Sequence, residues 1–257
     1  PVSPRADMRE ATPIADVDAP AITSDAEVCM AECDGGSSSG KAKQRHFGPC
    51  CARNYTLDGW YLAGSRRPGD WNMVHDVMLF DVIQINASLD TTVLENVTLH
   101  NPKRHGSSPL FLWGCVFKHV KLSGSLSGLK INRSAGPLHP DQQKWDAAIL
   151  AFYDTVDWAL DISDAKFKGG CTFEAIPGHL IRRNPETQVL VKRNKLQASD
   201  WRRLQYYGTG QDIGLSWFLS ESLFDSVVLA ARTGSKWAKR DLAVFNMLRS
   251  EGIAEPD

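Results

Sequence analysis

The chain has 257 residues, of which 42% are hydrophobic and 23% charged, and its formal net charge at pH 7 is −1. These values are ordinary for a globular protein and give no overall field that would favour a nucleic acid, a membrane surface or an acidic substrate. The length fits one large domain or two small ones. The longest apolar run, near residues 223–231, is too short to span a bilayer.

Residues 1–45 differ in composition from the rest. They are rich in Pro, Asp, Ser and Gly, they contain no aromatic residue, and residues 35–40 read GGSSSG. Such a segment cannot bury enough apolar surface to offset the entropy lost on ordering. We predict a disordered N-terminal segment with a Gly/Ser linker over 1–45, and folded structure from residue 46 onward.

From residue 77 onward, large apolar residues recur at every fifth position, a period that neither a helix nor a flat strand produces. Two residues before each lies a small or β-branched residue, such as Ala87 before Leu89, and Gln84 is the one polar member of the apolar series. The rhythm is interrupted at residues 101–109 and resumes at Leu112. It becomes irregular near Ser127 and Asn132, and a shorter stretch follows at residues 160–167. The predicted ladder comprises Leu79, Leu89, Leu94, Leu99, Leu112, Phe117, Leu122, Ile162 and Phe167.

The segments ASLDT, TVLEN, VTLHN, CVFKH, VKLSG and DAKFK carry this rhythm. It resembles the pentapeptide-repeat family over about residues 77–132 and 160–173. The resemblance implies a right-handed parallel β-helix in which four pentapeptides form one square coil, with the Leu or Phe pointing to the axis. The alternative is an irregular antiparallel β-domain in which the leucine spacing is coincidental.

About three coils, stacked at the usual interstrand spacing of about 4.8 Å, would make a short stub that needs caps at its ends. Some members of the family mimic duplex DNA and bind a topoisomerase, which needs an acidic rod. Lys118, Lys121, Lys130 and Arg133 lie in the coil region, so we do not transfer that role.

Helical patterns flank and interrupt the repeats. Residues 141–153 place Trp145, Ile149 and Phe152 at helical spacing, residues 187–193 read as a strand, and Ser199 or Asp200 is placed to start a short helix. Residues 215–232 and 235–252 are predicted as two helices, with one apolar stripe formed by Leu219, Leu223, Val227 and Ala230. Joined by Thr233–Ser235, they would form a helical hairpin.

The predicted fold is therefore mainly β: a short right-handed parallel β-helix of pentapeptide type, with an inserted helix and a C-terminal helical hairpin. The predicted domain organisation is a disordered segment over 1–45, a β-helix domain over 46–198 with the insertion near 141–153, and a C-terminal helical cap or dimerisation region over 199–257.

Cysteines invite a metal interpretation that their spacing does not favour. Cys29, Cys33, Cys50 and Cys51, with His46, lack the paired C-x2-C pattern of zinc sites. We interpret these cysteines as free thiols, or as disulfides if the chain is exported. Cys115 and Cys171 fall at or near the small position of the repeat, where a thiol is an inert packing group. No metal and no cofactor is predicted.

No catalytic motif stands out, and no catalytic residue is assigned. Asp76, Asp81, Asp90 and Glu95 lie on or near the first coil, and some carbohydrate-active β-helices use such carboxylates. We interpret them instead as part of a solvated outer face. The histidines are dispersed, and none is predicted to pair with a carboxylate.

One basic cluster has aromatic residues beside it, Trp201, Tyr206 and Tyr207. Such a cluster suits a phosphate backbone or a protein partner, although a solvated face is the simpler interpretation. Its members, the candidate nucleic-acid or partner-binding residues, are Arg182, Arg183, Lys192, Arg193, Lys195, Arg202 and Arg203.

The sequence therefore favours a non-enzymatic protein-binding or scaffold module with an unknown protein partner or a homodimer contact through 215–250. The alternatives are a nucleic-acid-associated factor using the 182–203 cluster and a carbohydrate-acting enzyme on the β-helix face. A cytoplasmic location is slightly favoured, and secretion is the alternative because of four N-x-S/T sequons, at Asn54, Asn86, Asn96 and Asn132.

Overall fold

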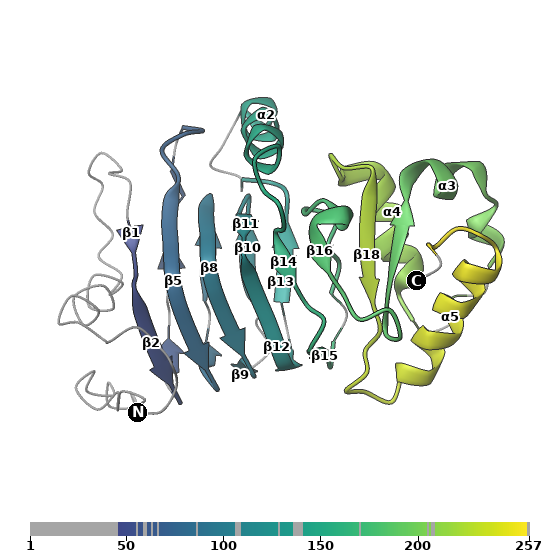
Figure 1. The fold of residues 1–257 in the computed structure, drawn as a ribbon, viewed down its shortest axis with the longest axis horizontal. Helices are drawn as coiled ribbons and strands as arrows, with labels where there is room; N and C mark the ends of the chain where they lie inside the picture. Colours follow the sequence, from purple (N-terminus) through teal and green to yellow (C-terminus); the bar gives the residue numbers. More distant parts are fainter. Residues whose placement is uncertain are drawn as a thin grey trace, which may run out of the picture.

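The computed structural model describes residues 46–255 except 55, 59–60, 63, 66, 86, 106–108, 128, 136–140, 170, 205 and 207–208. The predictions for residues 1–45 lie outside this part of the chain. The described fold is mainly β and is dominated by parallel sheets (Figure 1). No described helix has the length and apolar character needed to cross a membrane.

Three parallel sheets form most of the molecule, and their strands stack side by side along its long axis (Figure 1). The first sheet contains β1 (His46–Phe47), β2 (Cys50–Arg53), β5 (Asn72–Phe80), β8 (Thr92–His100), β11 (Val116–Lys118), β12 (Val120–Leu126), β14 (Leu160–Asp161), β15 (Ala165–Phe167) and β16 (Ile181–Arg182). The second contains β3 (Thr56–Asp58), β6 (Ile83–Ile85) and β9 (Lys103–Arg104). The third contains β4 (Tyr61–Leu62), β7 (Ser88–Asp90), β10 (Leu110–Trp113) and β13 (Leu129–Asn132).

The chain visits the sheets in a repeating order. From β5 in the first sheet it passes through β6 in the second and β7 in the third, and returns as β8 beside β5. Val74 pairs with Leu94 and Leu79 with Leu99, so the offset between neighbouring strands equals four repeats of five. The next pairing, Leu94 with Phe117, has an offset that is longer by three.

The three additional residues fall on one edge. Gln84 and Leu89 are five residues apart, whereas their register partners Arg104 and Leu112 are eight apart. The pairing on either side of this segment keeps its register. The extra length is therefore taken up between the second and third sheets.

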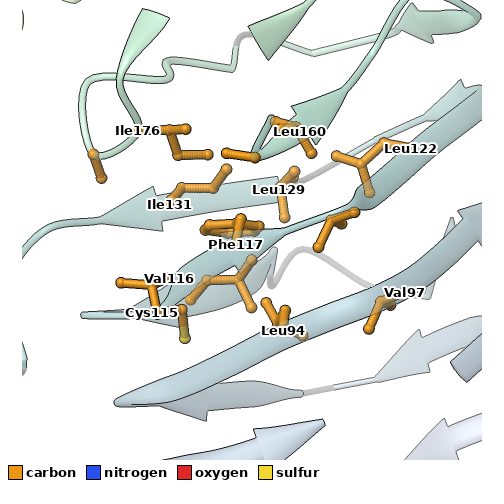
Figure 2. Close-up of a cluster of buried hydrophobic side chains, with 14 of the residues drawn as sticks. Leu94, Val97, Cys115, Val116, Phe117, Leu122, Leu129, Ile131, Leu160 and Ile176 are labelled. Carbon is orange, nitrogen blue, oxygen red and sulfur yellow. The ribbon is translucent and has the colours of Figure 1, made fainter. Parts of the chain in front are cut away.

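The predicted ladder residues lie in the core. All are buried except Leu99, which is half-buried and packs against the same core. Phe117 lies between Leu94 and Ile131 at the centre of this cluster (Figure 2). Gln84, the polar exception, is also buried, and its Oε1 accepts a hydrogen bond from the Ala87 backbone N–H at 3.4 Å. The five-residue rhythm thus identifies inward-facing positions.

A second rhythm, which the sequence analysis did not use, marks the bends between strands. The second residue after each ladder position from Leu79 to Leu122 has a positive φ, between 41° and 70°, whereas no such bend follows Ile162 or Phe167. This left-handed conformation favours Asn, Asp and Gly. The bends are Asn54, Asp76, Asp81, Thr91, Asn96, Asn101, Gly114, His119 and Gly124. Two of the four sequon asparagines, Asn54 and Asn96, have this conformational reason to be Asn.

The predicted inserted helix is confirmed as α2 (Gln142–Tyr153), with Asp141 accepting from the Lys144 backbone N–H at its start. Trp145, Ile149 and Tyr153 are buried, and the Tyr153 hydroxyl accepts a hydrogen bond from the Phe117 backbone N–H at 3.2 Å. The helix therefore packs onto the same core as the parallel sheets and satisfies a backbone donor of β11.

The predicted helix over 215–232 is wrong in its second half. Helix α4 (Gln211–Glu221) ends early, and β18 (Ser226–Ala230) pairs antiparallel with β17 (Gln188–Lys192), the predicted strand. Every residue of β18 is buried, because Val228 faces the core of the parallel sheets while Val227 faces a second core. A strand buried on both sides shows no alternation and is easily mistaken for a helix.

The C-terminal helical hairpin is therefore also wrong. A strand precedes the last helix, α5 (Ala238–Ser250), which was predicted correctly. The stripe proposed for docking is largely used internally, since Val227 and Ala230 are fully buried and Leu219 and Leu223 half-buried.

Short helices complete this end of the molecule. They are η2 (Gly178–Leu180), α3 (Arg193–Ala198), which was not predicted, and η3 (Trp201–Arg203), which follows Asp200 as predicted. The second core combines Val189 and Leu196 with Phe218 and Phe245. The boundary predicted at residue 199 falls inside this packing unit.

Candidate binding surfaces

The outward side of the third sheet carries two aromatic residues. Leu112 of β10 is buried, so its neighbours Phe111 and Trp113 lie on the opposite side of the strand. Their rings stack with centroids 5.7 Å apart, and both side chains are half-buried. Phe111 pairs in register with Lys130 of β13, which brings a cation beside the rings on the same sheet face.

Helix α4 extends this face. The Nζ atom of Lys130 lies 5.4 Å from the ring centre of Trp217. Trp217 and Ile213, one helical turn apart, expose 41% and 50% of their surface. We call the set Phe111, Trp113, Lys130, Ile213 and Trp217 the aromatic surface. Exposed aromatic groups beside a cation are typical of the anchors of protein interfaces.

The rim of the aromatic surface carries both signs of charge. Arg133 Nε lies 3.7 Å from Asp146 Oδ1 on α2, and Arg133 Nη2 lies 4.0 Å from Glu221 Oε2 on α4. With Lys130 these groups add up to two cations and two carboxylates. The surface therefore has no net charge that would attract a polyanion.

Two carboxyl groups are buried near this face. Asp90 is the register partner of Trp113, and burial raises the pKa of its carboxyl to about 7. Burial also raises the pKa of Glu174, although a Thr172 hydrogen bond and the Lys130 charge act against that shift. Asp90 is therefore only partly ionised at neutral pH.

The predicted basic cluster is not one free patch. Arg193 is committed to the fold, since its guanidinium donates to the carbonyls of Phe218, Leu219, Ser222 and Phe224 at 2.8–3.1 Å. These carbonyls lie at and beyond the end of α4, where helical partners run out after the Phe218 carbonyl, which also accepts from the Ser222 backbone N–H. Arg193 thus fastens the connection between α4 and β18.

The other members of the cluster are divided among separate contacts. Lys192 Nζ pairs with Glu255 Oε1 at 3.0 Å, and Arg203 pairs with Asp200. Arg182 lies over the Trp158 ring and Arg202 over the Trp201 ring. Lys195 is exposed and Arg183 half-buried. The structure therefore divides the seven residues among separate contacts and does not assemble them into a common site.

The four carboxylates Asp76, Asp81, Asp90 and Glu95 have separate environments, and Asp81 lies 3.8 Å from Lys103 Nζ. Asp76 accepts from Asn96 and contacts His75, Glu95 pairs with Lys118 at 2.7 Å, and Asp90 is buried. The prediction of unpaired histidines is wrong for His75 and also for His119, whose Nε2 lies 2.6 Å from Asp157 Oδ1. The chain distance of 38 residues hides this second pair in the sequence.

A basic pocket of about 410 Å³ opens at the bends between the first and second sheets. Asn101 at its wall accepts a hydrogen bond from the Ser125 backbone N–H at 2.8 Å, and Lys103 Nζ lies 3.8 Å from Asp81 Oδ1. Its lining is Asp81, Asn101, Pro102, Lys103, Arg104, Ser125, Ser127 and Lys168. This pocket was not predicted from the sequence, because the offset between β8 and β12 is 23 residues rather than the 20 found between β5 and β8.

The described cysteines are thiols, and burial raises the pKa of both Cys115 and Cys171 to about 12. This fits their interpretation as packing groups. Cys50 and Cys51 are half-buried, and Cys29 and Cys33 lie outside the described residues. Within the described part of the chain, no group of three or more His, Cys, Asp or Glu residues is placed to hold a metal ion.

At the level of class, the chain is a mainly β protein with parallel sheets and an aromatic surface. No family model, curated protein or solved structure matches it.

Proposed function

We propose that the chain is a protein-binding module in which a pentapeptide-type, right-handed parallel β-helix serves as a rigid scaffold. The β-helix is supported by the pairing offset of four repeats, by the order in which the chain visits the three sheets, and by left-handed bends five residues apart. A scaffold whose bends recur in register holds outward side chains in fixed positions. Such a surface binds without a large loss of conformational entropy.

The observation that carries the binding role is the aromatic surface. Trp217 and Ile213 are large apolar groups that remain exposed in a molecule whose other described large apolar residues, apart from Leu150, are at least partly covered. They continue the stacked rings of Phe111 and Trp113 through Lys130. Burying such groups against a partner gains about 25 cal/mol for each Å² of apolar area removed from water.

A protein partner fits this surface better than a nucleic acid. The two cations near Trp217 are balanced by Asp146 and Glu221, and carboxylates repel phosphates. The residues of the 182–203 cluster are largely engaged in pairs and ring contacts elsewhere. A rim of mixed charge instead matches the polar edge of a protein interface.

The test compares exposed apolar residues inside and outside the aromatic surface. The full chain is used as bait, retained proteins are identified, and their affinities are measured again by calorimetry with purified components. Trp217→Ala should weaken binding by about tenfold or more, whereas Leu150→Ala, with 42% exposure on α2, should change it less than about twofold.

Light scattering on the wild type and on Trp217→Ala decides whether the partner is a second copy. A dimer that becomes a monomer in this variant would identify the chain itself as the partner. Partner affinity that is equal in the wild type and in Trp217→Ala would contradict the proposal.

A further inference from the structure

The basic pocket is separate from the aromatic surface. The pocket lies at the bends between the first and second sheets, whereas the aromatic surface lies on the third sheet and α4. Three cations line it: Lys103 and Arg104 from β9, and Lys168 from the residue after β15. Among the described lining residues Asp81 is the one carboxylate, so these residues add up to two net positive charges.

The lining is held in place by the fold. The Asn101 side-chain oxygen accepts a hydrogen bond from the Ser125 backbone N–H, and the Lys168 backbone N–H donates to the Leu126 carbonyl at 2.8 Å. Gly124 has no side chain, and a Cβ there would lie 2.1 Å from Asn101 Oδ1. These contacts fix the hydroxyl-bearing residues of β12 and its end next to the cations.

We propose that this pocket binds the phosphoryl group of a small phosphomonoester. Such a group carries a charge of about −1.5 to −2 at pH 7 and presents three acceptor oxygens, which matches the two net positive charges of the described lining and the hydroxyl donors of Ser125 and Ser127. A monocarboxylate would neutralise only half of that charge. The volume of about 410 Å³ lies within the usual range for small-ligand sites and leaves room for the organic part of the ester.

Lysine deletions inside and beside the pocket test the site. The probes are glycerol 3-phosphate and inorganic phosphate, titrated calorimetrically into the full chain at low ionic strength. Lys168→Gln should weaken binding of both by about tenfold or more, because a charge-assisted hydrogen bond is lost. Lys166→Gln removes another exposed charge, from β15 and outside the pocket lining, and should change affinity by less than about threefold.

Asp81→Asn provides a test in the opposite direction. Asparagine suits the left-handed backbone of this position, as it does at Asn54 and Asn101, so the fold is preserved. Removing the carboxylate deletes a repulsive charge and releases Lys103. Phosphate affinity should increase by about fivefold.

Three results would overturn the proposal. The first is equal loss of affinity in Lys168→Gln and Lys166→Gln, which would mean general charge attraction. The second is unchanged or weaker binding in Asp81→Asn. The third is glycerol 3-phosphate that binds no more tightly than inorganic phosphate, which would leave no role for the organic part of the ester.

Discussion

The structure of the parallel sheets and that of the C-terminal unit, which comprises β17, β18 and helices α3, η3, α4 and α5, depend on different features of the sequence. In the parallel sheets, a left-handed bend follows two positions after the ladder residues from Leu79 to Leu122, so a local five-residue code sets the direction of the chain there. In the C-terminal unit, β17 and β18 separate two cores, with Leu190 and Val228 on one side and Val189 and Val227 on the other. The two strands are stabilised by the segments that pack on both of their sides, and these segments are distant in the sequence.

This difference shows where sequence periodicity is informative. Periodicity reports one-sided or axial burial, and it fails where both sides of an element are covered. The two regions should therefore respond differently to substitution, because the first depends on filling an interior and on bend geometry, and the second on contacts between distant segments.

Phe117→Ala should give the largest loss and tests the interior of the parallel sheets. Phe117 is 1% exposed, and truncation of a buried Phe costs about 3–5 kcal/mol of unfolding free energy. Denaturant unfolding gives the value. Phe111→Ala, on the outward side of the same sheet stack, should cost much less, about 1 kcal/mol. Similar losses in the two variants would mean that the ladder does not line the interior.

Asp90→Asn tests a buried carboxyl of the parallel sheets. The pKa of Asp90 is raised to about 7 in the folded state, so the folded state holds this proton where the unfolded chain, with an ordinary pKa near 3.9, releases it. Stability should fall as the pH rises from about 4 to 7 and then level off, by up to about 4 kcal/mol for this group.

Urea unfolding at pH 5 and pH 8 measures this effect. The wild type should lose more stability between the two values than Asp90→Asn, and the variant should be the more stable protein at pH 8. An unchanged pH dependence in Asp90→Asn would assign the effect to another group, with Glu174 the next to test by Glu174→Gln.

Arg193→Met should open the C-terminal unit and leave the parallel sheets folded. The guanidinium donates to four carbonyl groups of residues 218–224, and losing these charge-assisted hydrogen bonds should cost about 3 kcal/mol. Hydrogen exchange should increase in α4 and β18 first. Arg203→Met, whose side chain is 85% exposed, should stay within about 0.5 kcal/mol of the wild type.

The smallest expected effects compare one left-handed glycine from each region. Gly124 has φ 70° and Gly210 has φ 73°, so alanine costs both about 1 kcal/mol of backbone strain. At Gly124 the added Cβ also meets Asn101 Oδ1, whereas Gly210 has open space. Gly124→Ala should therefore cost about 2 kcal/mol or more. Equal melting temperatures for the two variants would contradict this difference.

The inward positions were predictable because the five-residue repeat is visible within a short stretch of sequence. Leu89, Leu94 and Phe117 followed from spacing alone, and so did the inserted helix with Trp145 and Ile149. The bends were equally predictable, since Asn, Asp or Gly often stands two residues after the ladder position, but that second rhythm was not used.

The remaining features depend on contacts that spacing does not report. Arg193 belongs to a basic run in the sequence, and only the fold shows that it closes the end of α4. The aromatic surface joins Phe111 to Trp217, which are far apart in the sequence, through Lys130. Neither relation has a periodic signature.

The three surplus residues between Arg104 and Leu112 indicate how this molecule tolerates changes of length. The flanking pairings, Gln84 with Arg104 and Leu89 with Leu112, keep their partners despite the surplus. We expect the segment between β9 and β10 to tolerate insertions. A reporter peptide introduced between residues 105 and 109 should leave the neighbouring strands in register. One residue added inside β8 would instead turn every following side chain of that strand to the opposite side.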